Sequence, residues 1–169
     1  MEFGVLGPLM VRHEGREIEI TSGQQRCVLA LLLLEVDRAV PLARLVALLW
    51  EDGAAPRTAR NVVQRCVSEL RRLMRADPRV RLAHTPAGYV LEADPGLIDL
   101  HRFRSLVATA PAGEQAAGLR RALALWRGEP LADIDVPGLT AIRHVLVEER
   151  LAVLENCLEA EVESGRTSE

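Results

Sequence analysis

Residues 56–75 read PRTARNVVQRCVSELRRLMR, and they separate into two faces when placed on a helix at about 100° per residue. One face is apolar and is formed by Ala59, Val62, Val63, Cys66, Val67, Leu70, Leu73 and Met74. The opposite face is basic and polar, with Glu69 at its flank as the one acid. Pro56 suits the first turn of such a helix, because its missing N–H costs nothing there. The segment therefore predicts an amphipathic helix with a basic outer face.

The outer face of this helix carries the chemical groups that read DNA. Guanidinium forks, amides and a hydroxyl can hydrogen-bond to base edges in a major groove and hold phosphates. The side chains that we predict to contact DNA from this helix are Arg57, Arg60, Asn61, Gln64, Arg65, Ser68, Arg71, Arg72 and Arg75. The alternative interpretation is a solvated surface helix, because surface helices commonly turn a charged face to water.

The distribution of charge along the chain favours the DNA interpretation. Positions 57–81 carry eight arginines and two carboxylates, although the whole chain has a net charge of −3. Positions 96–169 are acidic, with eight arginines against twelve Asp and Glu residues. A basic segment inside an acidic chain creates a localised field that attracts an anionic partner.

The elements expected around the basic helix give the layout of a winged helix. Short strands are predicted from Phe3 to Val11 and from Ile18 to Ile20. A leucine-rich helix with an N-cap at Thr21 or Ser22 is expected to run to about Val36, and the next helix to span 41–50. Residues 80–91 then form a hairpin around a Pro-Ala-Gly turn. In a winged helix, this hairpin is the wing and lies along the neighbouring groove.

The hairpin adds Arg81, His84 and Thr85 to the predicted DNA contacts. Taken alone, the hairpin is equally consistent with an edge ribbon that closes a sheet, but beside a basic helix we interpret it as the wing. We therefore divide the chain into a winged-helix DNA-binding domain, residues 1–95, and a helical domain, residues 96–169.

The second domain follows a linker at Asp94-Pro95-Gly96 and is expected to be helical over residues 100–110, 114–126 and about 138–164. Its last helix carries a single apolar stripe formed by Val147, Leu151, Leu154, Leu158 and Val162. Helices with one stripe need a neighbouring surface, so we expect a TPR-like array of helical hairpins that packs against the winged helix. The predicted fold class is mainly α with small antiparallel β-sheets.

Several classes of function find no support in the sequence. The longest apolar run, residues 27–34, is far shorter than the roughly 20 residues that cross a bilayer. The N-terminal residues lack the features of a secretory signal, so a cytoplasmic location without membrane contact is expected. The scattered Cys27, Cys66 and Cys157 match no metal or redox spacing and are interpreted as buried thiols. Since phosphate loops, nucleophile elbows and paired histidine motifs are also missing, we expect no enzyme, no metal and no cofactor.

A series of motifs in a definite order gives the chain a family resemblance. They are FGVLGPL at 3–9, Gln25-Arg26 before LALLLL at 29–34, residues 45–50, VSELRRL at 67–73, TPAGY at 85–89, DLHRF at 99–103 and LRRALALWRGEPLAD at 119–133. With these motifs the chain resembles the Streptomyces antibiotic regulatory protein family of transcriptional activators over essentially its whole length. That family joins an OmpR-type winged helix to a bacterial transcriptional activation domain. The resemblance implies that residues 96–169 are the N-terminal part of that domain.

The resemblance also implies a function and its partners. The family binds direct repeats in double-stranded promoter DNA, with two protomers side by side, and recruits RNA polymerase holoenzyme to antibiotic biosynthesis genes. The positions that match the family's DNA contacts are Asn61, Gln64, Arg65, Ser68, Arg71, Arg72 and Thr85. A polymerase-facing loop is implied just before the basic helix, and here it consists of Glu51, Asp52, Gly53, Ala54 and Ala55. The alternative function is a protein-interaction module whose acidic helices bind a partner, and the salt dependence of DNA binding separates the two.

Overall fold

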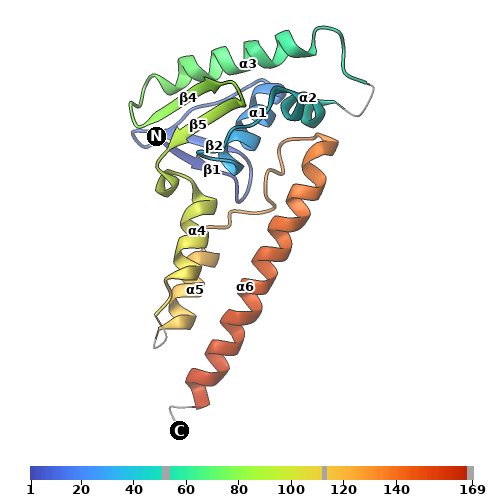
Figure 1. The fold of residues 1–169 in the computed structure, drawn as a ribbon. Coiled ribbons are helices and arrows are strands. Elements are labelled where there is room, and N and C mark those ends of the chain that lie inside the picture. Colours follow the sequence, from blue (N-terminus) through green and yellow to red (C-terminus); the bar gives the residue numbers. More distant parts are fainter. Residues whose placement is uncertain (51–53, 112–113, 167–169) are drawn as a thin grey trace.

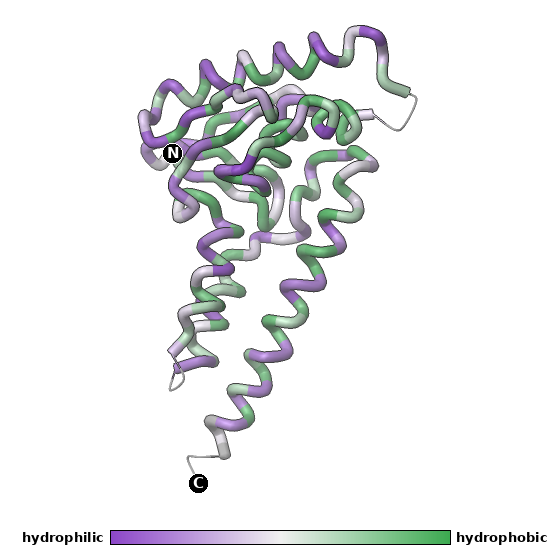
Figure 2. The backbone as a smooth tube through the Cα atoms, in the orientation of Figure 1, coloured by the Kyte–Doolittle hydropathy of each residue, from purple (hydrophilic) through white to green (hydrophobic). Residues whose placement is uncertain are grey.

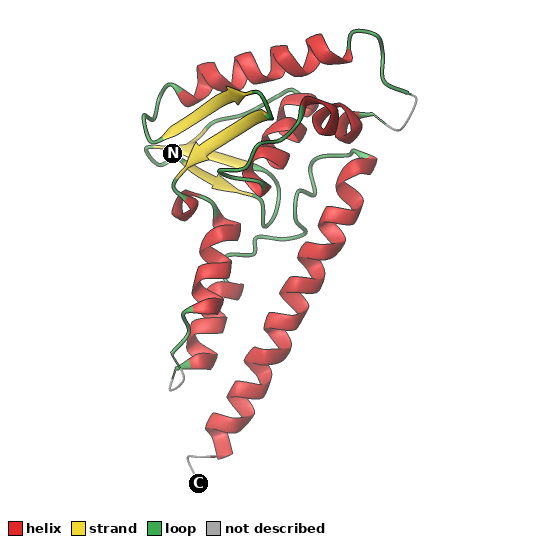
Figure 3. Cartoon of the chain, viewed as in Figure 1, coloured by secondary structure: helices red, strands yellow, loops and turns green. Residues whose placement is uncertain are grey.

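The computed structural model describes residues 1–50, 54–111 and 114–166 (Figure 1). Helices dominate, and two small antiparallel sheets accompany them (Figure 3), which confirms the predicted fold class. Helix α3 (Ala59–Met74) lies along one side of the molecule. Helices α4 (Asp99–Ala108), α5 (Gln115–Leu123) and α6 (Thr140–Arg166) extend away from the opposite side.

The first sheet is built from β1 (Glu2–Gly4), β2 (Met10–His13) and β3 (Arg16–Glu17), paired antiparallel in that order. The strand expected at 18–20 is wrong, because pairing stops at Glu17. The amide of Ile18 still donates to the Val11 carbonyl, but the chain then turns inward to bury Ile20 ahead of α1.

Helix α1 (Gly23–Leu34) forms the centre of the core, as its leucine-rich sequence predicts. The Ser22 hydroxyl caps it by accepting a hydrogen bond from the Gln25 amide at 3.4 Å. Every side chain from Cys27 to Leu33 is buried, so the helix is covered on all sides. Burial also raises the pKa of the Cys27 thiol to about 12, which agrees with an inert structural thiol.

Helices α2 and α3 differ in how well the sequence predicts their starts. Helix α2 (Leu42–Leu49) begins after Pro41 and ends at Trp50, as expected. Helix α3 begins at Ala59, so the placement of Pro56 in its first turn is wrong. Residues 57 and 58 form a turn, closed by the Ala59 amide donating to the Pro56 carbonyl, and this turn delays the helix.

The predicted hairpin is present as β4 (Val80–Thr85) and β5 (Gly88–Ala93), paired over their full length. Its second strand also pairs with the connection between α1 and α2, where Val40 and Tyr89 exchange two backbone hydrogen bonds of 2.8 and 2.9 Å. Gly88 makes this approach possible, because a Cβ atom there would lie 2.2 Å from the Val40 carbonyl oxygen. Its φ of +140° also disfavours any other residue.

The second half of the chain packs as helices around α5, which contacts both α4 and α6. Two short 3-10 turns, η1 (Pro95–Leu97) and η2 (Pro137–Leu139), precede α4 and α6 respectively. Trp126 lies after the end of α5 rather than inside it, and its ring meets Phe103 of α4 edge-on at 5.5 Å between centroids. This aromatic pair belongs to the same buried cluster as the residues of β1 and α1.

Hydrogen bonds fasten the two halves of the chain together, as the sequence analysis expects. The carboxylate of Asp99, at the start of α4, accepts from the amides of Val5 at 2.8 Å and Leu6 at 3.1 Å. Arg127 donates to the Pro8 carbonyl at 2.9 Å. Burial raises the pKa of Asp99, and these two amides and the Arg127 guanidinium oppose that shift by stabilising the charged form.

The loop at residues 5–9, which contacts Asp99 and Arg127, is also bound by Asp133. The Leu9 amide donates to Asp133 at 2.8 Å, and Asp133 also pairs with Arg26 of α1 at 2.9 Å. In addition, the amide of Arg127 donates to the Leu6 carbonyl at 2.7 Å. The motifs FGVLGPL and WRGEP are therefore the two sides of one interface.

Helix α6 has two apolar faces, whereas its sequence pattern predicts one. The inward face buries Leu146, Val153 and Cys157 against the rest of the molecule. The predicted stripe lies on another side of the helix, where Leu151, Leu154, Leu158 and Val162 are exposed, with Leu158 at 53% of its full accessibility, and Val147 is half-buried. The expectation of a single stripe that packs inward is therefore wrong for this helix.

Candidate nucleic-acid interface

Helix α3 has the two faces that its sequence predicts. Its inward side chains Ala59, Val63, Cys66, Val67, Leu70 and Met74 are buried, while Val62 and Leu73 are half-buried at the edges. Figure 2 shows hydrophilic and hydrophobic residues alternating along α3 as the helix turns. The predicted contact residues that are exposed are Arg57, Arg60, Asn61, Gln64, Arg65, Ser68, Arg72 and Arg75. The structure thus brings most of the predicted set onto one solvent-facing surface.

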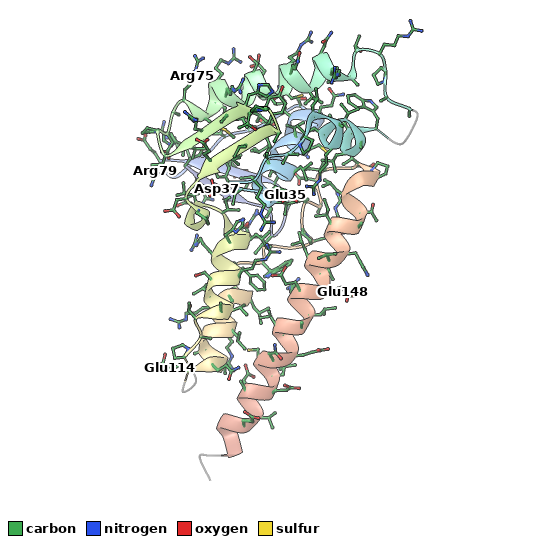
Figure 4. The ribbon with its side chains drawn as sticks, in the orientation of Figure 1. Glu35, Asp37, Arg75, Arg79, Glu114 and Glu148 are labelled. Carbon is green, nitrogen blue, oxygen red and sulfur yellow. The ribbon has the colours of Figure 1, made fainter. Side chains whose placement is uncertain are left out.

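Four arginines of this surface carry charge that is not neutralised by a neighbour. Among the described residues, no hydrogen bond or ion pair engages the side chains of Arg57, Arg60, Arg65 or Arg75. Arg75 projects outward at the C-terminal end of α3 (Figure 4). Unpaired guanidinium groups on an exposed face are available to an anionic partner.

Arg72 is exposed but has an acidic neighbour one turn away. Its Nη2 atom lies 2.5 Å from Oε2 of Glu69, and both side chains face solvent. Exposed pairs of this kind contribute about 0–1 kcal/mol, so a phosphate can compete for the arginine. Arg72 can therefore bind a phosphate at the small free-energy cost of giving up its pair with Glu69.

Arg71 differs from the other arginines of the helix, because its side chain is half-buried against the hairpin. Its Nε atom donates to the backbone carbonyl of Leu82 at 2.8 Å. Its guanidinium carbon lies 6.0 Å from the centre of the Tyr89 ring. The expectation that Arg71 points to solvent is not met, since β4 packs beside α3 and Tyr89 of β5 lies within reach of this side chain.

The hairpin residues predicted to contact DNA have three different environments. Arg81 forms two hydrogen bonds with Glu92 on the opposite strand. His84 is exposed, and its ring packs against Tyr89 with 4.9 Å between centroids. The Thr85 hydroxyl donates to the Gly88 carbonyl at 3.1 Å and so closes the turn. Arg81 and His84 are exposed, whereas Thr85 is half-buried, and Arg81 is engaged by Glu92.

Arg79 is a cation near this surface that the sequence analysis does not include among the contacts. It lies beyond the end of α3, at the same end of the molecule as Arg75 (Figure 4). Two of its nitrogens bond to the buried carboxylate of Asp77, and this guanidinium holds the pKa of Asp77 well below its ordinary value. An aspartate two residues before an arginine is the local signal for such a pair, which forms in the turn after α3.

The loop implied to face polymerase is only partly covered by the structure. Ala54 and Ala55 are exposed, whereas Glu51, Asp52 and Gly53 lie outside the described residues. The loop follows α2, whose C-terminal turn packs on η2 of the second half. Gly138 allows this packing, because a Cβ atom there would lie 2.9 Å from the carbonyl oxygen of Leu48.

The described residues contain no group of three or more His, Cys, Asp or Glu side chains that could hold a metal ion. All three cysteines are buried and free, in agreement with their interpretation as structural thiols. Within the same ranges, the longest and most apolar helices still fall short of what a membrane span requires.

Comparison with known proteins identifies relatives over the whole chain. Residues 98–169 match the family described as the bacterial transcriptional activator domain. The transcriptional regulatory protein EmbR of Mycobacterium tuberculosis is 36% identical over 99% of this chain, which covers 46% of that protein. The regulatory proteins AfsR of Streptomyces coelicolor and DnrI of Streptomyces peucetius are 34% and 30% identical over 98% of this chain, covering 17% and 66% of their lengths.

A solved structure shows the same architecture. EmbR of Mycobacterium tuberculosis, in complex with a low-affinity phosphopeptide, superposes with a TM-score of 0.88 at 34% identity. The match covers 99% of this chain and 47% of that one, so the present chain spans about half of its relative. A winged helix-turn-helix followed by a helical activator domain is therefore the shared arrangement.

Proposed function

We propose that this chain, which belongs to the Streptomyces antibiotic regulatory protein family of transcriptional regulators, binds specific double-stranded DNA by placing α3 in a major groove. One observation carries the proposal. Helix α3 exposes Asn61, Gln64 and Ser68 along one side, and unpaired arginines flank them. A surface of neutral hydrogen-bonding groups bordered by cations matches a groove floor bordered by phosphates.

The dimensions of the helix suit this placement. With 16 residues, α3 is about 24 Å long at roughly 1.5 Å per residue, and a major groove about 12 Å wide admits one α-helix. Residues 61, 64 and 68 are spaced by three and four positions, so their side chains follow one line on the helix. Each of the two amides can bond an adenine edge in the bidentate manner.

The arginines are proposed to bind mainly the phosphate backbone. Arg57 and Arg60 lie at the N-terminal end of the exposed face, Arg65 in its middle and Arg75 at its end, so their charges span the length of the helix. Each phosphate that an arginine neutralises releases condensed counterions, and log K then falls with log salt concentration by about 0.9 per contact. The four unpaired arginines therefore account for affinity, and the amides account for sequence preference.

We further propose that the protein activates transcription from promoters with direct repeats, through two protomers side by side, and that it recruits RNA polymerase holoenzyme. Antibiotic biosynthesis genes are the proposed targets, in line with the family. The loop at 51–55 is the proposed polymerase contact within the first half. The docking of residues 98–169 onto the winged helix supports a division of labour in which this half orients the molecule toward polymerase.

DNase footprinting on promoter fragments, with the whole chain, tests the DNA proposal. We expect protection of a direct repeat and a steep fall of affinity with salt. Arg60→Ala and Arg65→Ala should each reduce the log–log salt slope by about one. Arg102→Ala is the matched control, because Arg102 is an exposed arginine of α4, on the opposite side from α3. Equal salt slopes for the wild type and all three variants would show that α3 does not contact DNA.

Transcription in vitro tests the activation proposal separately. Purified holoenzyme and a template with the protected repeat should give more transcript when the protein is added, and Arg60→Ala should lower that gain at limiting protein concentration. The whole chain is needed, because the two halves share one core and a cut at residue 95 would expose buried residues such as Phe3. DNA binding without any gain in transcript would show that the protein binds the promoter but does not activate transcription. Capture of a partner protein without salt-dependent DNA binding would favour the interaction-module alternative.

A further inference from the structure

Arg71 connects the candidate recognition helix to both strands of the hairpin. Its Nε atom donates to the Leu82 carbonyl of β4 at 2.8 Å, and its guanidinium carbon lies 6.0 Å from the Tyr89 ring centre on β5. The first contact fixes the direction of the side chain, and the second places the cation by an aromatic face. Among the described arginines of α3, this is the one whose guanidinium is engaged by another element.

Tyr89 is held in turn from the other side of the hairpin. Its backbone exchanges hydrogen bonds of 2.8 and 2.9 Å with Val40, which precedes α2. The neighbouring Gly88 leaves no space for a side chain against the Val40 carbonyl. The hairpin is therefore held by two contacts. Val40 binds it through backbone hydrogen bonds, and Arg71 binds it through its side chain.

The contacts continue from Tyr89 to the exposed end of the hairpin. His84 stands directly opposite Tyr89 in the strand register, and the two rings are 4.9 Å apart with 38° between their planes. The next pair in the register is Thr85 with Gly88, whose hydrogen bond closes the turn. A continuous set of contacts therefore runs from Arg71 through Tyr89 to His84 and Thr85 at the end of the hairpin.

We infer that Arg71 is a wing-positioning residue: it sets the hairpin at the angle to α3 at which His84 and Thr85 reach DNA, and it does not itself bind phosphate. The inference rests on the proposed DNA-binding function. Arginine is required for this role. Lysine lacks both the Nε–H group that donates to the Leu82 carbonyl and the planar guanidinium that lies over the Tyr89 ring. A phosphate contact, in contrast, needs only a positive charge within reach.

The test compares Arg71→Lys with Arg102→Lys in the whole chain, because Arg102 is an exposed arginine of α4 that lies outside the proposed interface. We expect Arg71→Lys to weaken binding to the protected promoter site by roughly three- to tenfold, the range given by losing one weak hydrogen bond and one cation–π contact. Its salt slope should stay that of the wild type, since the number of phosphate contacts does not change. Arg102→Lys should bind within about twofold of the wild type, because this side chain is exposed and far from the proposed interface.

Two further measurements distinguish a positioning role of Arg71 from a direct contact with DNA. His84→Ala should weaken binding in the wild type but have little additional effect in Arg71→Lys, because the wing is already displaced. Without DNA, the ring-proton NMR signals of His84 should shift in Arg71→Lys and not in Arg102→Lys, since they lie in the ring-current field of Tyr89. Thermal unfolding of both variants provides the check on folding.

The outcomes are distinct for each failure. A salt slope that falls by about one in Arg71→Ala, together with an additive effect of His84→Ala in Arg71→Lys, would show that Arg71 touches phosphate and would overturn the inference. Unchanged His84 signals in a folded Arg71→Lys protein would also overturn it. Absence of DNA binding by the wild-type protein would overturn the proposed function, while the NMR comparison would still test the contact between helix and wing.

Discussion

Arg81 and Glu92 face each other across the hairpin, with Nε 2.8 Å from Oε2 and Nη2 3.2 Å from Oε1. Both side chains are substantially exposed, so the pair adds about 0–1 kcal/mol to stability. Its larger effect is electrostatic, because a carboxylate next to the wing's arginine offsets a charge that phosphate would otherwise attract.

Replacing Glu92 by Gln should therefore strengthen DNA binding. The substitution removes a negative charge and frees Arg81 for a phosphate, so affinity should rise several-fold and the salt slope should steepen by up to about one. Fluorescence anisotropy at four salt concentrations measures both. Glu129→Gln, at an exposed glutamate in the second half, is the control. Identical slopes for the two variants would place Arg81 away from DNA.

Gln64→Ala should relax sequence preference more than it lowers affinity for random DNA. The amide carries no charge, so it contributes through paired hydrogen bonds to a base rather than through counterion release. Competition between promoter and random DNA should show discrimination reduced by about 1–3 kcal/mol at one base pair. Arg75→Ala should instead weaken binding to both DNAs alike. An equal loss on both DNAs in Gln64→Ala would assign this side chain to the backbone.

Asp99→Ala should destabilise the whole molecule. It leaves the buried amides of Val5 and Leu6 without their acceptor, and each orphaned donor costs about 1–3 kcal/mol. We expect a loss of about 2–5 kcal/mol in the free energy of unfolding, measured with urea. Asp94→Ala, which removes an exposed acceptor for the Gly96 amide, should cost less than about 1 kcal/mol. Similar small losses in both variants would mean that the halves do not depend on this contact.

The two apolar faces of α6 should respond differently to truncation. Leu146→Ala empties a buried position and should cost about 2–5 kcal/mol, because it combines lost transfer energy with a cavity. Leu158→Ala changes a half-exposed position and should stay within about 0.5 kcal/mol. Chemical unfolding of each variant gives both values. A large cost at Leu158 would show that a partner covers the outer face in solution.

The Cys27 thiol should be inert in the folded protein and should make stability depend on alkaline pH. Burial raises its pKa to about 12, whereas an unfolded cysteine titrates near 8.5. Between these values the unfolded chain loses a proton that the folded chain keeps, so the free energy of unfolding should fall as pH rises through this range. Cys27→Ala should reduce that slope. Fast reaction of this thiol with Ellman's reagent at pH 8 in native protein would contradict the assignment.

Local periodicity predicts well those parts of the molecule whose neighbours along the chain determine them. The two faces of α3, the hairpin and the caps of α1 and α2 follow from spacing and turn residues. The engagement of Arg71 does not follow, because the helical pattern places it beside Arg72 and only the position of β4 and β5 separates their roles. Nor does one sequence reveal that residues 5–9 bind Asp99 and Asp133, since about a hundred positions lie between the partners.

The same spacing argument explains the outcome for α6. Charged Glu149 and Arg150 lie between the inward residues Leu146, Val153 and Cys157. The helical pattern therefore predicts the more regular outer leucines as the buried face. Both charged side chains have partners that make this tolerable. Glu149 pairs with Arg104 of α4 at 2.8 Å, and the Arg150 guanidinium carbon lies 5.2 Å from the ring centre of Trp126.

The docking of the second half through Asp99 and Asp133 ties the direction of α6 to that of α3. On direct repeats, each bound protomer is related to the next by translation along the duplex, without a two-fold axis. Neighbours then meet through two different faces, so the contact between them is heterologous. A row of such protomers has a polarity, with one face left open at its upstream end and the other at its downstream end. An assembly of the proposed kind therefore distinguishes one direction along the duplex from the other.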